Sequence, residues 1–361
     1  MNQAIVTQPG ARTLLPPRAV LRRIFAFGVG LYIILLVIYL VLRIALGDGV
    51  WWLSLLNAFA HLLFAPLLVL FPLAFFIDGR SAFRLMPLVL VAGLWFGPYY
   101  MAQSVPESSG PFLHIVTFNI WGDNPRMQDV ETWIRDSGAD VVLLQEIPET
   151  YSENGFPNLL DTYPHQFVQP LEMREWGNAI LSRIPFTGSE NFDLEGDGTP
   201  SHQRVTVDLD GTPVAVYNIH LEMPIGEVAH FSTPFDNPFL HLALKYDDTF
   251  RDAEIARLVE RLEAEPLPFV MGGDFNTSDQ SLVYWQLAAH GQDAFREVAN
   301  GFGASWPVPV GGELPTLLPP LLRIDYVWHS GEFHVLDAQQ GPVLGSDHLP
   351  LDVTLALSYA S

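Results

Sequence analysis

The sequence predicts a globular α/β fold, with mixed β-sheets covered by helices, preceded by three membrane-spanning helices. Two observations lead to this prediction. The chain of 361 residues is 49% hydrophobic, and the excess of apolar residues lies in its first hundred positions. In the remainder, short apolar strands alternate with polar loops, and some neighbouring strands have a helix between them while others do not. This alternation favours mixed sheets over a purely parallel, doubly wound sheet.

Three apolar runs predict the membrane helices, at about 24–46, 50–77 and 85–103. The first run is close to the roughly 20 residues that cross a bilayer. It could instead be a signal peptide, because Arg22-Arg23 faintly resembles a twin-arginine signal, but the run is long and no small-residue cleavage site follows. The third run could be re-entrant or interfacial, because Pro87, Gly93 and Pro98 interrupt it.

The orientation of these helices follows from their flanking positive charges, which concentrate on the cytoplasmic side of membrane proteins. The predicted tail, 1–17, and the start of the first helix are basic, and the second loop is flanked by Arg80 and Arg84, whereas the first loop has only Arg43 with Asp48. The N-terminus is therefore predicted to be cytoplasmic. With three spans in 18–103, a linker at 104–111 and the globular domain at 112–361 lie outside the cytoplasm, and the lipid bilayer is a predicted partner.

The charge of the chain is unevenly distributed. The net charge is −22, but residues 1–103 are basic, and the remainder holds 11 Lys and Arg against 38 Asp and Glu, a net charge of −27. Such an acidic domain repels polyanions, so long nucleic acid is an unlikely partner. The chain has no cysteine, which excludes disulfides and thiolate metal sites. Nothing in the sequence indicates an oligomeric state.

Apolar runs and helical periodicity place the elements of the globular domain. The predicted helices cover 127–137, 247–263 and 281–289, the second because its apolar residues recur with a period of 3.6. The predicted strands cover 113–119, 141–144, 179–182, 204–208, 214–220, 268–272, 323–329 and 352–357. In the strand at 268–272, Gly272 and Gly273 are expected to let the backbone turn before Asp274.

Polar residues follow these strands, where α/β folds place their sites. They are Asn119, Glu146, His220, Asp274 with Asn276, Asp325, and Asp347 with His348. Taken singly, most have an ordinary structural explanation: Asn119 as a turn residue, His220 as a core histidine, or Asp274 and Asn276 as an Asx turn. Asp325 lies among strand residues, where a carboxylate needs a partner.

As an ordered set, the motifs point to one family. They are Thr117-Phe118-Asn119, Leu144-Gln145-Glu146, Gly177-Asn178-Ala179-Ile180-Leu181-Ser182-Arg183, Asn218-Ile219-His220-Leu221, Gly272 with Asp274-Phe275-Asn276, Ile324-Asp325-Tyr326-Val327, and Gly345-Ser346-Asp347-His348-Leu349-Pro350. The set resembles the endonuclease/exonuclease/phosphatase superfamily over about residues 112–358. This resemblance implies a four-layer α/β sandwich, with two mixed sheets between helices. It also implies hydrolysis of a phosphate ester with a divalent cation, usually Mg²⁺, with Mn²⁺ possible.

The resemblance also implies roles for the acidic residues. Mg²⁺ prefers oxygen ligands, so Glu146 is the expected primary ligand, assisted by Asn119 and Asp347. Asp274 is expected to orient or deprotonate the attacking water. Asp325 is expected to fix the tautomer of His348.

The remaining residues are expected to contact the phosphate. Asn276 and His220 are expected to donate hydrogen bonds to its oxygens. His348 is expected to act from the other side as a base or charge stabiliser, and its role could be exchanged with that of Asp274. Asn178 and Arg183 match a motif near the phosphate, although Arg183 could instead brace the sheet.

The motifs give the reaction class, and the loops set the substrate. The loop at 189–201 is acidic and flexible in composition, and those at 223–246 and 301–322 are rich in apolar residues that could pack on the domain or face a membrane. We expect a membrane-anchored phosphoesterase acting on a lipid headgroup or a small ester. The alternatives are an extracytoplasmic nuclease, which requires a basic groove, and a non-catalytic binding module, which requires a missing site residue.

Overall fold

The computed structural model describes residues 17–101, 110–169, 177–194, 202–232, 238–310 and 317–358. The predicted tail, apart from Pro17, and most of the predicted linker lie outside these residues. The chain divides into two compact units. The first comprises residues 1–45 and 61–96, and the second comprises residues 46–60 and 97–361.

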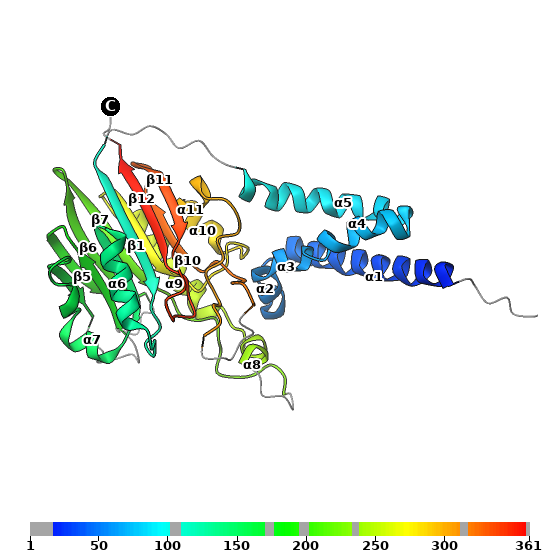
Figure 1. The fold of residues 1–361 in the computed structure, drawn as a ribbon, viewed down its shortest axis with the longest axis horizontal. Coiled ribbons are helices and arrows are strands. Elements are labelled where there is room, and N and C mark those ends of the chain that lie inside the picture. Colours follow the sequence, from blue (N-terminus) through cyan, green and yellow to red (C-terminus); the bar gives the residue numbers. More distant parts are fainter. Residues whose placement is uncertain are drawn as a thin grey trace, which may run out of the picture. The chain divides into compact units, whose positions relative to one another are not determined.

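The apolar N-terminal region is helical (Figure 1). Its elements are α1 (Pro17–Leu46), α3 (Ala60–Phe64), α4 (Leu67–Ile77), α5 (Gly79–Phe96) and a 3₁₀ turn at Gly97–Tyr100. Among the residues that the structure describes, three stretches are long and apolar enough to cross a membrane, namely Arg18–Leu46, Ala60–Ile77 and Gly79–Tyr100. The third begins earlier than the predicted 85.

The second apolar run departs from the prediction of one helix over 50–77. Its first part forms a separate helix, α2 (Trp51–Ala58), which ends before Phe59 and belongs to the second unit. Polar residues explain the division. Ser54 and Asn57 are fully buried on α2, where Ser54 donates a hydrogen bond to Asp248 and the Asn57 amide donates to Asp48 at 2.5 Å. The Ser54 bond attaches α2 to the strand-containing part of the second unit, and the Asn57 bond joins α2 to the turn before it.

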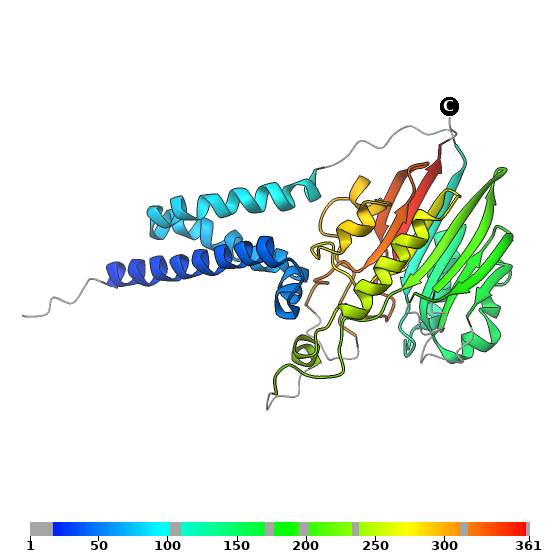
Figure 2. The same cartoon turned by 180° about the vertical axis from the view of Figure 1, so that it is seen from behind.

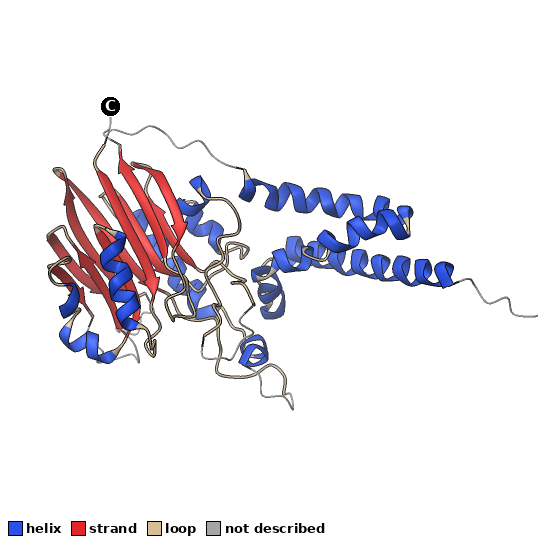
Figure 3. Cartoon of the chain, in the orientation of Figure 1, coloured by secondary structure: helices blue, strands red, loops and turns tan. Residues whose placement is uncertain are grey.

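The second unit contains two six-stranded sheets with helices on their outer faces (Figures 1 and 3). The first sheet has the order β11 (Phe333–Gln340), β12 (Leu351–Leu357), β1 (Phe112–Asn119), β2 (Val141–Ile147), β4 (Gly177–Ser182) and β3 (His165–Val168). The second has the order β5 (Phe186–Phe192), β6 (His202–Leu209), β7 (Thr212–His220), β8 (Phe269–Asp274), β10 (Asp325–His329) and β9 (Gln292–Asp293). Both are mixed, as predicted.

Alternation along the strands builds a layered core. In β1, Ile115 faces the other sheet, where it shares a cluster with Val216 and Val270, while Val116 packs with Val130 of α6 (Met127–Ser137). On the far side, Met271 of the second sheet packs with helix α9 (Thr249–Glu263), and Figure 2 shows α9 across that sheet. The predicted α/β sandwich with two mixed sheets is therefore confirmed. The remaining helices are α7 (Glu149–Asn154), a 3₁₀ turn at Pro157–Leu159, α8 (Pro238–Leu244), α10 (Tyr284–Ala288) and α11 (Ala294–Val298).

In each sheet, two neighbouring parallel strands end on the same side of the sandwich. Strands β1 and β2 run parallel in the first sheet, and β7 and β8 run parallel in the second. Strands β10 and β12 run antiparallel to β8 and β1, so they begin where β8 and β1 end. The polar residues at these positions are thus brought to one side of the sandwich.

Candidate active site

The two glycines before Asp274 lie inside strand β8 and make no turn, which corrects the sequence-based expectation. A Cβ atom on Gly273 would lie 1.7 Å from the carbonyl oxygen of Ile219 on β7. One on Gly272 would lie 2.8 Å from Leu143 of the facing sheet. The glycines therefore permit close packing, and this packing sets where Asp274 ends the strand.

Glu146 is aimed by a distortion of strand β2. The pairing of β2 with β4 shifts register between Leu144 and Ile147, and Glu146 has a positive φ of 55°. Such a bulge redirects a side chain at the end of a strand. Asn276 also has a positive φ, of 46°, and backbone strain of this kind is concentrated at functional sites.

Asn119 joins the two principal carboxylates. Its amide nitrogen donates to Glu146 at 2.9 Å and to Asp274 at 3.0 Å. The carbonyl oxygen of Asn119 accepts a hydrogen bond from Ser346 at 2.7 Å, which ties strand β1 to the segment that carries His348. Asn119 therefore holds both carboxylates at the ends of their sheets, and burial raises the pKa of Glu146 despite the hydrogen bond from Asn119.

Asp325, His348 and Asp274 form a buried chain of charged groups. His348 Nδ1 lies 2.9 Å from Asp325 Oδ2, and His348 Nε2 lies 3.6 Å from Asp274 Oδ2. Burial alone would lower the pKa of His348, but Asp325 and Asp274 raise it well above the ordinary value. Burial has the opposite effect on a carboxyl group, and it raises the pKa of Asp274. The imidazole and Asp274 are neighbours, so His348 and Asp274 are suited to share one proton.

A cavity of about 120 Å³ opens over these groups. Since roughly 10–15 Å³ accommodates the centre of one water molecule, several waters fit. Its polar lining includes Glu146, Asp274, Asn276, Asp347 and His348, while Asn119, His220 and Asp325 are not in the lining and each lies beside one of these residues. Five of the residues predicted from the sequence therefore meet at one cavity. Leu55, Ala58, Phe59, Met223, Pro224, Leu322 and Ile324 also line it.

His220 and Asn276 flank the carboxylates. His220 Nε2 lies 3.7 Å from Glu146 Oε1. The Asn276 side chain donates one N–H to the carbonyl oxygen of Leu221 at 2.9 Å, and its backbone N–H donates to Asp274 at 2.9 Å. The Asx turn considered for this segment is therefore present. Because an amide carries two N–H groups, Asn276 keeps one for a ligand.

Asn178 and Arg183 lie outside the cavity lining. Asn178 is buried near the start of β4, next to the residue paired with Ile147. The Arg183 guanidinium donates to the carbonyl oxygen of Gly138 at 2.8 Å and lies over the ring of Tyr163. This position corresponds to the alternative that Arg183 braces the sheet. Arg183 does not reach the cavity where the phosphate is expected.

Among the described residues, two sets of side chains could supply ligand atoms to a metal ion. Asp274, Asp325 and His348 each offer a ligand atom within 4.8 Å of the others. Glu146 and Asp347 offer oxygen atoms to the cavity, with Asn119 beside Glu146. An oxygen-only set suits Mg²⁺, whereas an imidazole nitrogen suits transition metals. The buried Glu146 carboxylate suits a hard divalent cation. The oxygen ligands at the cavity therefore match the divalent cation that the sequence implies.

Several residues at the cavity were not identified from the sequence. Trp306 donates its indole N–H to Asp347 at 3.0 Å, and the buried Arg251 donates to the carbonyl oxygen of Asn276 at 3.0 Å. His202 accepts from the backbone N–H of His220 at 3.2 Å. The motifs give no signal for these residues, although an arginine inside an apolar helix face and a tryptophan in a loop are cues to a supporting role.

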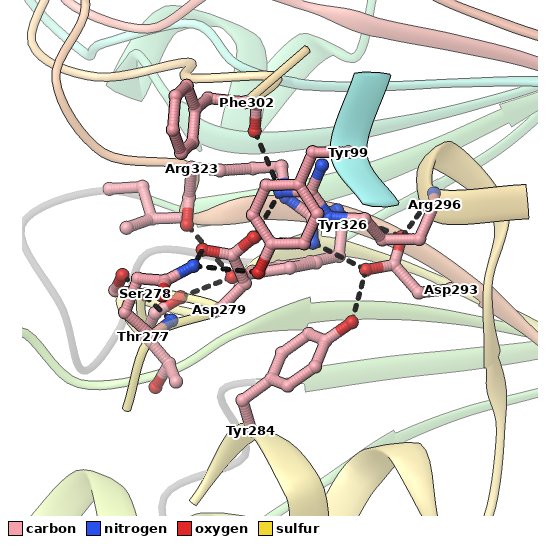
Figure 4. A network of polar contacts seen from close by, with 12 residues as sticks. Tyr99, Thr277, Ser278, Asp279, Tyr284, Asp293, Arg296, Phe302, Arg323 and Tyr326 are labelled. Atoms are coloured by element: carbon pink, nitrogen blue, oxygen red, sulfur yellow. Dashed lines mark hydrogen bonds and ion pairs between the residues drawn. The ribbon is translucent and has the colours of Figure 1, made fainter. Parts of the chain in front are cut away.

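A buried ionic network holds the loop that follows Asp274 (Figure 4). Asp279 accepts hydrogen bonds from Arg296 and Arg323, and Arg323 also donates to Asp293 at 2.6 Å. Tyr326 donates its hydroxyl to the carbonyl oxygen of Thr277 at 2.7 Å. Because these groups are buried and mutually paired, the loop 277–280 has a fixed course beside the site.

The comparison with known proteins agrees with this architecture. The profile of the Endonuclease/Exonuclease/phosphatase family matches residues 116–348, so the chain belongs to that family. Members of this family are generally metal-dependent hydrolases of phosphate esters. The uncharacterized protein YbhP of Escherichia coli K12 is 25% identical over 226 residues, which span 56% of this chain and 76% of YbhP.

Two solved structures show the same fold. An endonuclease/exonuclease/phosphatase from Bacteroides vulgatus superposes with a TM-score of 0.54 at 17% identity, covering 68% of this chain and 99% of that protein. A functionally unknown conserved protein from Enterococcus faecalis V583 superposes with a TM-score of 0.51 at 18% identity, covering 68% of this chain and all of that protein. Both matches concern the fold alone.

Proposed function

We propose that this protein is a membrane-anchored, divalent-metal-dependent phosphoesterase that hydrolyses a lipid headgroup or another small phosphate ester. The observation that carries the proposal is the meeting of Glu146, Asp274, Asn276, Asp347 and His348 at one cavity, with Asp325 bonded to His348 behind it. This set contains the acid, base and hydrogen-bond donors that ester hydrolysis needs.

Each of the site residues has a separate role in the proposed hydrolysis. Asp274 accepts a proton from the attacking water, whose oxygen forms a new bond to phosphorus while the ester P–O bond breaks. His348, oriented by Asp325, stabilises the negative charge or supplies the proton that the leaving oxygen takes up. Asn276 and His220 donate hydrogen bonds to the phosphoryl oxygens. Both side chains are partly shielded from solvent, which makes each contact electrostatically stronger than in bulk water.

Glu146, with Asn119 and Asp347, would hold the divalent cation, Mg²⁺ or Mn²⁺. When bound, this ion offsets negative charge on the phosphoryl and leaving oxygens. The alternative group of Asp274, Asp325 and His348 would place it differently, and metal affinities of single variants distinguish the two.

The proposed anchor is the set of three apolar helices, with the N-terminus in the cytoplasm and the hydrolase outside it. One hydrogen bond supports the two crossings by the second and third candidate spans. Ser278 of the globular domain donates to the carbonyl oxygen of Ala58 at 2.8 Å, and both residues belong to the second unit. Two intervening crossings would put the residues before the second span and after the third on one side of the membrane, and this contact is what such an arrangement requires.

The experiment is a metal-dependence assay of the purified full chain. Hydrolysis of bis-p-nitrophenyl phosphate, a phospholipid panel and plasmid DNA would be measured with Mg²⁺ and with EDTA. We expect Mg²⁺-dependent turnover of the small ester or of a lipid, with little nicking of the plasmid because the domain is strongly acidic. Absence of metal-dependent turnover on every ester would refute the enzyme, and efficient plasmid nicking would favour the nuclease.

A further inference from the structure

Helix α2 is attached to the globular domain at three separate places. Ser54 donates a hydrogen bond to Asp248, and the Trp51 ring stacks on His230 with centroids 4.0 Å apart. At its C-terminal end, Ala58 accepts the hydrogen bond from Ser278, four residues after Asp274. The helix is therefore a built part of the second unit and lies against the loop that leaves the site.

This attachment gives the cavity an apolar wall. Leu55, Ala58 and Phe59 line it together with Met223, Leu322 and Ile324, whereas Glu146, Asp274 and His348 supply its charged part. Apolar side chains contribute nothing to binding a phosphate or a cation. They favour hydrocarbon, since removing apolar surface from water is favourable.

The wall is joined directly to the apolar helices. Phe59 immediately precedes Ala60, the first residue of the second candidate span. The loop after Asp274 is also bonded to the end of the third span, where Gln280 donates to the Tyr99 hydroxyl at 2.9 Å. The residues that directly precede the second span and those that end the third are thus bonded to one loop of the site.

We propose that α2 is a substrate-binding wall of the active site and that Leu55 and Phe59 contact the hydrocarbon part of a membrane lipid whose phosphate ester is hydrolysed at Asp274 and His348. This inference rests on the proposed phosphoesterase function and assigns its substrate class. The lipid supplies the ester and water supplies the oxygen, so the reaction needs no further reactant.

The test is a chain-length series measured on the full protein in nanodiscs. Methyl, butyl and octyl p-nitrophenyl phosphate carry the same scissile ester and differ only in hydrocarbon length. For the wild type we expect kcat/KM to rise from the methyl to the octyl ester by at least about tenfold, because one methylene in an apolar pocket is already worth roughly tenfold or more. Leu55→Gln should lower the octyl-to-methyl ratio by about tenfold.

Leu56→Gln is the matched control, because Leu56 has the same side chain on the same helix and does not line the cavity. It should keep the wild-type ratio. Thermal unfolding midpoints show whether each variant is folded, and Leu55→Ala and Phe59→Ala supply milder changes if Leu55→Gln is not.

The outcomes separate the two proposals. If no ester is hydrolysed with Mg²⁺, the phosphoesterase function fails. If the methyl and octyl esters are hydrolysed with equal kcat/KM, the phosphoesterase stands and the lipid assignment is overturned. An unchanged octyl-to-methyl ratio in folded Leu55 and Phe59 variants would remove α2 from substrate binding.

Discussion

Gly273 and Ile219 approach so closely that a single methyl group cannot fit between them. A Cβ atom on Gly273 would lie 1.7 Å from the Ile219 carbonyl oxygen, and Gly273 has a φ of 151°. Strands β7 and β8 are parallel neighbours, with Ile219 paired to Gly273 and His220 paired to Asp274. The close approach therefore determines the spacing of two predicted site residues.

Replacing this glycine should affect both stability and activity. Gly273→Ala is expected to destabilise the protein by about 1–3 kcal/mol or more, because the backbone must move to admit the methyl group. The resulting displacement of Asp274 should lower kcat by about 10²-fold. Thermal unfolding and ester hydrolysis measure the two effects. Gly188→Ala is the control, since its Cβ would meet only Thr206 at 3.6 Å, and it should resemble the wild type.

Asp325 should act through His348. In Asp325→Asn the amide would still fill the position, but it has no charge to stabilise a protonated His348 and its NH₂ group can favour the wrong tautomer, so kcat should fall by about 10²–10⁴-fold. The pH profile of the residual activity should also shift, which a purely structural role would not cause. Asp337→Asn, on an exposed position of β11, should change neither quantity. Wild-type kcat in Asp325→Asn would exclude the proposed orientation of His348.

Glu146 should dominate metal affinity. Glu146→Gln keeps the size of the side chain and removes its charge, and we expect the Mg²⁺ concentration for half-maximal activity to rise by about 10–100-fold, because Mg²⁺ depends on one or two carboxylates. Calorimetric titration gives the same affinity without turnover. If Asp325→Asn weakens binding more than Glu146→Gln, the ion is held instead by Asp274, Asp325 and His348.

The ionic network of Figure 4 should make the protein sensitive to acid. Burial alone would raise the pKa of Asp279, but Arg323 and Arg296 lower it below the ordinary value. A depressed pKa in the folded state means that the stabilisation is present above the unfolded pKa of about 3.9 and is lost as pH falls through the folded pKa.

Asp279→Asn should therefore destabilise the protein at pH 7 by about 3–5 kcal/mol, the range for breaking a buried pair. The difference in unfolding midpoint between variant and wild type should shrink below about pH 4. Asp136→Asn, at an exposed site on α6, serves as the control. An equal difference at pH 7 and pH 3.5 would contradict the linkage.

The absence of cysteine allows a direct test of topology. Glu332→Cys places one thiol on an exposed turn of the globular domain, and Gly79→Cys places one at the exposed first residue of the third candidate span, directly after the connection from the second. In intact cells, a membrane-impermeant maleimide should label Cys only in the first variant. Labelling of the second variant alone would reverse the proposed orientation.

The interior strands could be predicted from the sequence because they are continuous apolar runs. The four strands that were not predicted, β3, β5, β9 and β11, are the edges of the two sheets. An edge strand faces solvent and needs few apolar residues. In β5, Phe186–Phe192, the middle residues are exposed, so part of the segment expected to be an acidic loop is a strand.

The residues of the site could be predicted from the sequence, but their arrangement in space could not. Polar residues after apolar strands could be recognised, and their order matched a family. The register shift that aims Glu146 has no local sequence signal, because a bulge depends on the partner strand. Helix α2 was included in a membrane span because Trp51, Leu53 and Leu55 are apolar, and it is separated by contacts such as the hydrogen bond from the buried Ser54 to Asp248 of the globular domain.

A protein shortened to residues 112–361 would keep every acidic residue and histidine described for the site, yet it would lose Leu55, Ala58 and Phe59 from the cavity. Tyr246 and Asp248, now covered by Ser54, would face water. We expect such a fragment to accept soluble esters more readily relative to lipids than the intact chain does. Helix α2 and Phe59 would then help to select the substrate of the enzyme, although they precede the globular domain in the sequence.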